Sequence, residues 1–600
     1  MGAYNRQLHQ GNVQSTENGD GHTQFCGRSA ELQAAAGNPQ KIATEGSTDE
    51  ADIRTMPSLP QFIKPLSSSL GTDDLRYLAK RKCFECMSSD LERIVIRRYA
   101  EFIHPLIPVL DLDEFIGIVF GDLQQKISLL LYHTVLCAGL AVVEIETIHE
   151  YGYDSKPSAR EELYIKAKAL FDMDAEPDRL AASQAAVLLV TWGSNKHSRD
   201  AFYWLGIAIS LACALKMHSP EGSASLPKAE QSLRRRIWWT IIMKECDICL
   251  TLGRPPRVSP YRTALLQQEA FTNDARLTDY SKLPETGKLR RDPSVQPRLD
   301  MACMEKAKLS LVIYRILQLP RSSSDYTGNP HRRNARIWQL ESELKDWRLQ
   351  LPMELTSFNP TLTLSEDADR SLQMAISILH LTQLMALIML HKSEVPFATW
   401  LESPVSMPGD DWLEDDGARD AQGHIKSMRQ AAHEITAIHK TLHERGLTPS
   451  IPTIGVAAVC TAVFVCLLDA RSAQASVRQA SLDRLDTCLV VLRELGQINQ
   501  AATDVTTIVE SAIQTARDFP ATPAAQCADM AQNPSLNSDP SQTPHELECT
   551  THSYMEGVLP ARSDKRPNIA GSDTPALFVS AFGSTGQDLF LGMEEFFDFV

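Results

Sequence analysis

Cysteine is sparse in this sequence, and long hydrophobic runs are absent. The 13 cysteines among 600 residues are irregularly spaced, which excludes a disulfide-stabilised fold and favours free thiols in a reducing compartment. The first twenty residues have no apolar core, so we expect no signal peptide there. The most apolar stretch, residues 454–468, is shorter than the ~20 residues of a membrane-spanning helix. We therefore expect a chain without a membrane span, in which this stretch is a buried core helix.

Motifs of the common enzyme classes are also missing. The sequence contains no phosphate-binding loop, no dinucleotide-binding glycine fingerprint and no nucleophile elbow. The GSTG run at 583–586 has the wrong spacing for such an elbow. We therefore predict that the protein is not an enzyme and that it needs no cofactor.

Two Cys-x-x-Cys pairs are the strongest candidates for a metal site. Cys83 with Cys86, and Cys246 with Cys249, could together supply the four ligands of a zinc ion. However, residues 87–245 separate the pairs, and the second pair lies inside a strongly helical run. Free thiols in the core are therefore the preferred interpretation.

Histidines and acidic residues offer two weaker metal candidates. His433, His439 and His443 fall within one helical pattern, but they do not form the His-Glu-x-x-His motif of zinc proteases. The acidic cluster at 410–416 lacks the ligand spacing and the central glycine of an EF-hand. We interpret the histidines as a solvated polar face and the acidic cluster as a solvated loop, and predict no metal ligands.

The charge balance argues against a chain that wraps nucleic acid. The net charge is −16, and basic residues cluster only in short runs at 80–82 and 234–236. Either run could act as an import signal or contact phosphate. For residues 234–236 a solvated helix surface is the favoured interpretation.

Helical periodicity dominates the middle of the chain. Phe202, Leu205 and Ile209 are spaced by three and four residues, and Ser158 with Glu161 has the pattern of a capping box. Similar patterns cover residues 178–190, 332–349, 425–442 and 481–495. Alternating strand patterns are scarce, so we predict an all-α fold.

The composition divides the chain into three parts. Residues 58–518 carry the helical patterns and form one large predicted multi-helix domain, with linkers at 283–297, 351–367 and 396–423. Residues 1–57 and 519–600 are rich in small and polar residues. Such segments bury too little apolar surface to offset their chain entropy, so we predict disordered tails.

The last residues combine aromatic and acidic side chains. Phe590, Phe596, Phe597 and Phe599 alternate with carboxylates, whose repulsion keeps the rings solvated and available to a partner's groove. We predict an activation segment that binds transcription machinery or a coactivator. The alternative is a terminal helix that docks onto the protein's own core.

Three stretches resemble the helical regulatory domain of fungal zinc-cluster transcription factors, called the fungal-specific transcription factor domain. They are residues 96–115, residues 232–258, and residues 452–470 with 481–495. The second is the most specific, because SLRRRIWWTIIMKECDICLTLGRPPRV is similar to a signature of Arg-Arg-x-Trp-Trp, then Asp, then Gly-Arg-Pro. The lead-in at 59–81 resembles more narrowly the cutinase-transcription-factor-like subgroup.

The resemblance assigns a structural role to seven signature residues: Arg236, Trp238, Trp239, Asp247, Gly253, Arg254 and Pro255. Gly253 can end the helix, and Pro255 prevents its continuation. Asp247 lies among apolar neighbours, and a buried carboxylate needs a partner. We expect Arg254, just beyond the helix end, to be that partner.

One departure from the family concerns DNA binding. Members usually begin with a six-cysteine zinc cluster that inserts a helix into the major groove. Before Cys83 this sequence has only Cys26. We therefore expect no direct, sequence-specific DNA binding. Either the protein acts through a DNA-bound partner factor, or the start of the natural sequence is missing.

The resemblance implies a nuclear transcription regulator of lipid-utilisation genes or of a secondary-metabolite gene cluster, and the acidic-aromatic C-terminal segment favours an activator. A bundle of this kind can also host a small molecule between its helices. The alternatives from another class are a non-catalytic helical scaffold and a cytosolic helical enzyme. An enzyme would require polar residues that converge in a deep pocket.

Overall fold

The described part of the chain is almost entirely helical. The computed structural model describes residues 59–121, 124–192, 199–260, 295–319, 330–356, 366–395, 400, 416–472, 474–497 and 500–518. Within these ranges the only strand-like pairing is an isolated bridge between Ile63 and Ile127. The predicted all-α fold class is thus confirmed. The predicted tails, and most of the three predicted linkers, lie outside the described residues.

The helices follow one another along the chain with short connections where both neighbours are described. The α-helices are α2 (Thr72–Lys80), α3 (Ser89–Arg98), α4 (Leu112–Phe120), α5 (Leu129–Leu140), α6 (Ile145–Glu150), α7 (Lys156–Asp172), α8 (Arg179–Leu189), α9 (Ala201–Ala214), α10 (Lys228–Leu252), α12 (Val295–Leu317), α13 (Pro330–Leu349), α14 (Met353–Thr356), α15 (Glu366–His391), α17 (Asp416–Glu444), α18 (Thr453–Asp469), α19 (Ala475–Gly496) and α20 (Gln500–Asp518). A π-helical turn, η1, follows α3 at Tyr99–Ile103, and short 3₁₀ turns occur at Pro220–Ser223 (η2), Lys392–Glu394 (η5) and Thr448–Ser450 (η6).

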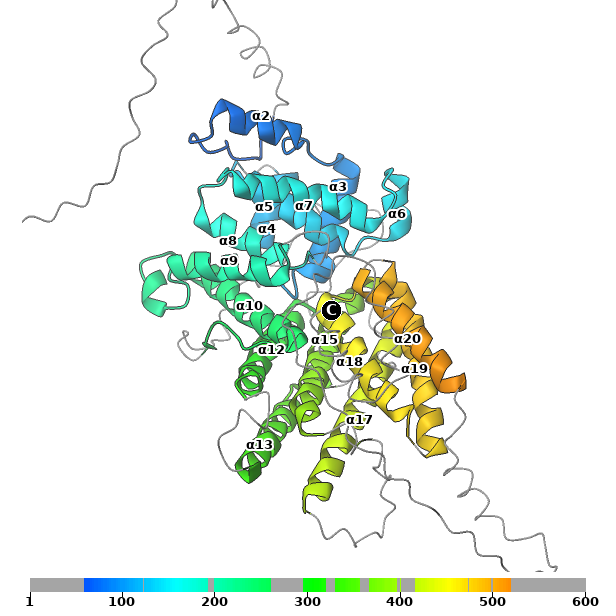
Figure 1. The fold of residues 1–600 in the computed structure, drawn as a ribbon. Helices are drawn as coiled ribbons and strands as arrows, with labels where there is room; N and C mark the ends of the chain where they lie inside the picture. Colours follow the sequence, from blue (N-terminus) through cyan, green and yellow to red (C-terminus); the bar gives the residue numbers. More distant parts are fainter. Residues whose placement is uncertain are drawn as a thin grey trace, which may run out of the picture. The chain divides into compact units, whose positions relative to one another are not determined.

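Helix α5 is the centre of the first group of helices. All its residues are buried, and it packs against α3, α7 and α8, while α8 packs against α9 (Figure 1). Ser128 caps its start by accepting a hydrogen bond from the Leu131 N–H at 3.3 Å. A helix that is apolar on all sides is stable in water only when others cover it, as they do here.

Helices α15 and α18 are the centre of the second group (Figure 1). Helix α18 is buried from Ile454 to Asp469 among α15, α17 and α19, which confirms the predicted core helix at 454–468. By length and composition alone, residues Arg370–Glu394 could cross a membrane, but 94% of the apolar window is buried inside the fold. It therefore serves as a second core helix.

Helix α10 connects the two groups. It contacts α8 and α9 of the first group and α12, α15 and α18 of the second (Figure 1). Because α10 contains the sequence signature, the signature residues lie where the two halves of the helical fold meet.

Several local predictions differ from the observed helix ends. Ser155, not Ser158, caps α7, since its Oγ accepts a hydrogen bond from the Ser158 N–H at 3.3 Å. Ser158 itself lies in the first turn of α7. Pro157 is tolerated in the same turn, because the first N–H groups of a helix have no partner within the helix. Cys460 and Cys466, within the predicted core helix at 454–468, are buried free thiols, whereas Cys213 is exposed near the end of α9.

Candidate functional site

The first half of the signature anchors α10 in the core. Trp238 and Trp239 are buried, and so is Arg236. Arg236 donates hydrogen bonds to the carbonyl oxygens of Pro108 at 3.3 Å and Leu110 at 3.1 Å. A buried guanidinium needs such acceptors to offset its lost hydration. The predicted solvated surface at 234–236 is therefore wrong at Arg236, which fastens α10 to the segment before α4.

The second half of the signature ends the helix. Gly253 adopts a left-handed conformation with φ +59°, and the Arg254 N–H donates to the Cys249 carbonyl at 3.0 Å. This geometry is a Schellman cap, which favours glycine because a side chain is strained at positive φ. The predicted helix end at Gly253 is confirmed, and Pro255 follows it.

We expect Gly253→Ala to lower the free energy of unfolding by about 1 kcal/mol, because alanine is strained in this conformation. Chemical denaturation of both proteins measures the difference. Alanine in place of Gly423 is a poor control, since its Cβ would lie 3.0 Å from the Trp338 ring, whereas Gly71 has only a contact of 3.5 Å. Gly71→Ala is therefore the matched control, and an equal loss in both variants would contradict the prediction.

The partner of Asp247 is a lysine from another helix. Asp247 is 5% exposed, and its Oδ1 lies 2.6 Å from Lys306 Nζ on α12. Lys244 Nζ lies 3.8 Å from Oδ2. The predicted pair with Arg254 is wrong, because the chain turns at Gly253 and places the Arg254 guanidinium 5.3 Å from the Phe202 ring.

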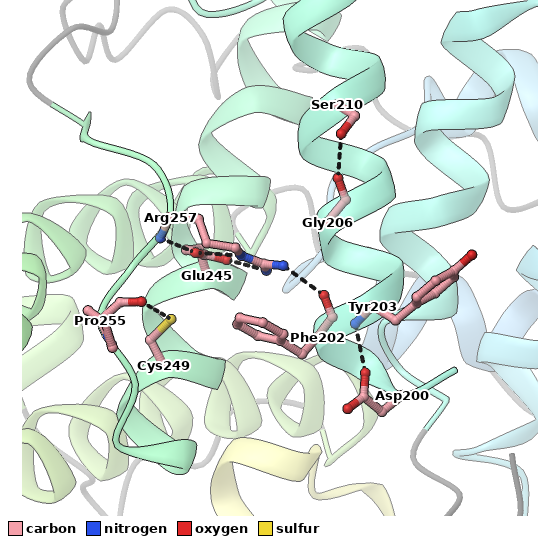
Figure 2. Close-up of polar contacts among 9 residues, drawn as sticks. All are labelled: Asp200, Phe202, Tyr203, Gly206, Ser210, Glu245, Cys249, Pro255 and Arg257. Carbon is pink, nitrogen blue, oxygen red and sulfur yellow. Dashed lines mark hydrogen bonds and ion pairs between the residues drawn. The ribbon is translucent and has the colours of Figure 1, made fainter. Parts of the chain in front are cut away.

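An ion pair between Glu245 and Arg257, here called the clamp, holds residues 253–257 against α10 (Figure 2). We call residues 253–257 the signature loop. Glu245 Oε1 accepts from the Arg257 backbone N–H at 2.6 Å and from Nε at 3.1 Å, while Oε2 accepts from Nη2 at 2.7 Å. Glu245 is only 1% exposed. Two parallel bonds between guanidinium and carboxylate are strong and directional. This pair was not predicted from the sequence, although a glutamate within an apolar helical run is a usable signal.

The clamp also holds the start of α9. Arg257 Nη1 donates to the Phe202 carbonyl at 2.9 Å, and its guanidinium carbon lies 3.6 Å from the centre of the Phe202 ring (Figure 2). Gly206 makes room for it, since a Cβ there would lie 3.0 Å from Nη1. The position of the Phe202 ring thus depends on the signature loop.

Beside α10 lies an interhelical cavity of about 280 Å³. Its walls include η1, the start of α9, residues 244–252 at the end of α10 and the segment 449–456 that leads into α18, with further residues from α7 and α19. Most of the lining is apolar; examples are Phe102, Ile248 and Ile454. Phe202 lines the same cavity, so the Glu245–Arg257 clamp holds part of its wall. Apolar cavities with a few polar groups are typical of small-molecule sites.

Two cations line this cavity. Burial lowers the pKa of Lys244, and the nearby Lys306 lowers it further, while Asp247 opposes the shift. Burial also lowers the pKa of Arg160. Arg160 donates hydrogen bonds to the backbone carbonyls of Cys137 at 3.1 Å and Thr191 at 2.9 Å, so these two acceptors are dipoles and not carboxylates.

The sequence candidates for metal binding do not converge. Cys83, Cys246 and Cys249 are buried free thiols, and burial raises the pKa of Cys83 and Cys249 to about 12. Such thiols are poor nucleophiles and poor metal ligands at neutral pH. Across the described residues, no group of three or more His, Cys, Asp or Glu side chains could hold a metal ion. The acidic cluster lies outside these residues, apart from Asp416 at the start of α17.

The predicted solvated face of histidines is wrong at one position. His433 and His443 are exposed, and His443 Nδ1 lies 2.7 Å from Glu494 Oε2. His439 is 1% exposed, because its side of α17 packs against α18, and burial lowers its pKa to about 4. It is therefore neutral at physiological pH and belongs to the core.

The fold and the site define a helical domain built around a buried signature helix with a small-molecule-sized cavity. Residues 96–389 match the fungal specific transcription factor domain. This part of the chain therefore carries the domain of that family, and the resemblance predicted from the sequence is confirmed. The family implies a nuclear role, and it is a family of transcription regulators, not enzymes. The residues of the predicted activation segment, Phe590, Phe596, Phe597 and Phe599, lie outside the described residues.

Similar proteins carry names of fungal regulators. Cutinase transcription factor 1 beta of Fusarium vanettenii is 27% identical over 480 residues, which are 76% of this chain and 53% of that protein. Transcription factor cpaR of Aspergillus oryzae is 23% identical over 432 residues, 68% of each chain. The fusaric acid cluster transcription factor FUB12 of Gibberella moniliformis is 26% identical over 196 residues, 32% of this chain and 28% of that protein. The chain spans about half the length of the first relatives that it matches.

Proposed function

We propose that this protein is a nuclear regulator of transcription whose helical domain responds to a small molecule. The observation that carries the proposal is the match over residues 96–389, together with the structural use of every part of the signature in that range. Arg236 and Gly253 fix the two ends of the buried part of α10, and Asp247 lies between them in an ion pair. These residues support a scaffold for regulation, and none of them has the geometry of a nucleophile with its base.

The cavity supplies a means of regulation. Its walls belong to both groups of helices, since α9 and η1 come from the first and α18 from the second. A ligand that fills it would stabilise one arrangement of these walls over others, which is the requirement for coupling to a distant surface. Under this proposal the ligand sets the activity of the regulator.

The names of the relatives support a proposal about the target genes. The names of cutinase, cpaR and fusaric acid cluster regulators support control of lipid-utilisation genes or of a secondary-metabolite gene cluster. We further propose that the chain reaches DNA through a DNA-bound partner factor and contacts a coactivator through its acidic-aromatic C-terminal segment. The aromatic residues would fill the coactivator's groove, while the carboxylates keep the free segment soluble.

A reporter assay tests this assignment. The full chain, and residues 519–600 alone, are each fused to a foreign DNA-binding domain and expressed with a matching reporter gene. We expect both fusions to raise reporter output above that of the DNA-binding domain alone. Replacing Phe596 and Phe597 with alanine should remove most of the increase, because the rings supply the buried contact. Equal output from all fusions would overturn the activator assignment.

The matched control keeps the charge and changes only residues outside the aromatic cluster. Ser580 and Ser584 are replaced with alanine in the same fusion, and we expect no change in reporter output. A loss as large as that of the phenylalanine variant would show that the segment acts through some other property.

A further inference from the structure

The charges around the cavity are unequal. Three cations, Arg160, Lys244 and Lys306, face two carboxylates, Asp200 and Asp247, in the cavity and directly behind it. Both carboxylates already have partners. Asp247 Oδ1 accepts from Lys306 Nζ at 2.6 Å, and Asp200 Oδ1 caps α9 by accepting from the Tyr203 N–H at 2.7 Å. Across the two adjoining cavities, these five side chains therefore carry one positive charge more than negative charges, and the additional cation is Lys306 behind the larger cavity.

The less compensated of the two lysines is Lys244. Its ammonium is 3.8 Å from Asp247 Oδ2, much farther than Lys306 is from Oδ1, and its side chain is only 15% exposed. Lys306 lines a smaller cavity of about 30 Å³, whereas Lys244 lines both that cavity and the one of about 280 Å³. Lys306 also donates to Thr382 Oγ1 at 2.7 Å, so its donors are engaged elsewhere. Lys244 is thus the ammonium group available to a ligand in the larger cavity.

We propose that the cavity binds an organic carboxylate with an apolar body, and that Lys244 holds the carboxylate while α10, η1 and α18 enclose the rest. A buried ammonium whose carboxylate partner is 3.8 Å away and shared with a second lysine is only partly compensated, and an anionic ligand supplies the missing compensation. A carboxylate carries one negative charge and matches the surplus of one. A phosphate monoester carries about −1.5 to −2 at neutral pH and would exceed it. This inference rests on the proposed effector function and names its ligand class.

Arg160, a second cation in the lining of the cavity, reinforces the preference for an anion. It comes from α7, and its guanidinium lies 5.3 Å from the Trp192 ring in addition to its two carbonyl acceptors. Both of these hydrogen-bond acceptors are neutral backbone carbonyls and not carboxylates. Its charge therefore adds to the positive potential of the cavity, which is strong in an apolar surrounding.

Calorimetric titration of the full chain tests the proposal. The probes are hexanoate, decanoate and 2-naphthoate, each compared with its neutral amide of the same size. We expect at least one acid to bind about tenfold more tightly than its amide, the size of one charge-assisted hydrogen bond. Lys244→Met should remove that preference, and Lys244→Arg should retain it. Lys440→Met is the control, because Lys440 is 63% exposed on α17 and should leave the preference intact.

Each outcome separates this inference from the function on which it rests. If acids and amides bind equally to the wild type, or if Lys244→Met keeps the tenfold preference, the carboxylate proposal is wrong. Ile248→Trp fills the cavity and should abolish binding of acid and amide alike. If no probe binds, the carboxylate proposal is overturned. If, in addition, Ile248→Trp leaves the reporter output of the full-chain fusion unchanged, the effector function fails as well.

Folding of the variants is checked independently. Lys244→Met leaves Asp247 paired with Lys306, so the buried carboxylate keeps its closest partner. Far-ultraviolet circular dichroism and the denaturation midpoint should therefore stay close to those of the wild type. Lys244→Arg is a second test of the role of this charge. It keeps a cation at position 244, so it must bind the preferred acid if the proposal is right.

Discussion

Replacing Glu245 with alanine will lower the free energy of unfolding by about 3 kcal/mol. The substitution removes the acceptor of three hydrogen bonds from Arg257, at 2.6, 2.7 and 3.1 Å. It also leaves the guanidinium without its counter-ion. The expected loss lies at the low end for a broken buried pair, because the Arg257 side chain is 29% exposed and can regain some hydration. Denaturation of the full chain, followed by circular dichroism, measures the change.

An exposed pair provides the control for this prediction. Arg493 binds Glu510 at 2.7 Å, but the two side chains are 59% and 45% exposed. Exposed ion pairs contribute about 0–1 kcal/mol, so Glu510→Ala should change stability little. If Glu245→Ala costs no more than Glu510→Ala, the clamp does not fasten the signature loop.

The clamp also has a consequence for the cavity. Because Arg257 contacts both the carbonyl and the ring of Phe202, loss of Glu245 should loosen the cavity wall that Phe202 forms. We therefore expect Glu245→Ala to weaken binding of the preferred probe as well as the fold. The signature loop then explains how residues that touch no ligand can still control ligand binding.

Features encoded by neighbours in the sequence were predictable. The helices near 178–190, 332–349, 425–442 and 481–495 correspond to α8, α13, α17 and α19, because apolar periodicity follows the helical turn. The helix end at Gly253 was predictable for the same reason, since a cap depends on residues one turn away. The buried core helix α18 followed from its continuous apolar run.

Features that depend on distant partners were not predictable from one sequence. Lys306, the partner of Asp247, lies 59 residues along the chain on α12, and nothing local marks it. Arg236 resembled its exposed neighbours in a basic run, yet its acceptors lie 126 and 128 residues earlier. The local pattern placed His439 on a polar face. It is buried because α18 covers that side of α17, which the sequence of α17 alone does not reveal. In each case the local sequence pattern indicates one environment for the residue, and tertiary packing gives it a different one.

Replacing Asp247 with leucine will have the other large effect, a loss of about 3–5 kcal/mol in the free energy of unfolding. Asp247 is the carboxylate shared by Lys306 at 2.6 Å and Lys244 at 3.8 Å. Both lysines are mostly buried, with side chains 13% and 15% exposed, so neither can recover full hydration. Chemical denaturation at neutral pH measures the loss.

A second substitution separates charge from packing. Lys306→Met in the Asp247→Leu background removes the closest unpaired ammonium, and we expect it to restore part of the lost stability. A double-mutant cycle should then give a coupling energy of about 1–3 kcal/mol between the two residues. Strictly additive losses would mean that Asp247 contributes through its shape alone.

The dependence on pH provides an independent test of the same cluster. Burial lowers the pKa of Lys244 below its usual 10.5, so between the two values the unfolded chain binds more protons than the folded one. Stability due to this group therefore rises with pH in that range. Without Asp247, which favours the charged form of Lys244, its pKa should fall further and the range should extend toward neutrality. The stability lost in Asp247→Leu relative to the wild type should consequently shrink as the pH is raised from neutral to mildly alkaline. A loss that stays constant with pH would mean that packing, and not the unpaired ammonium groups, accounts for the lost stability.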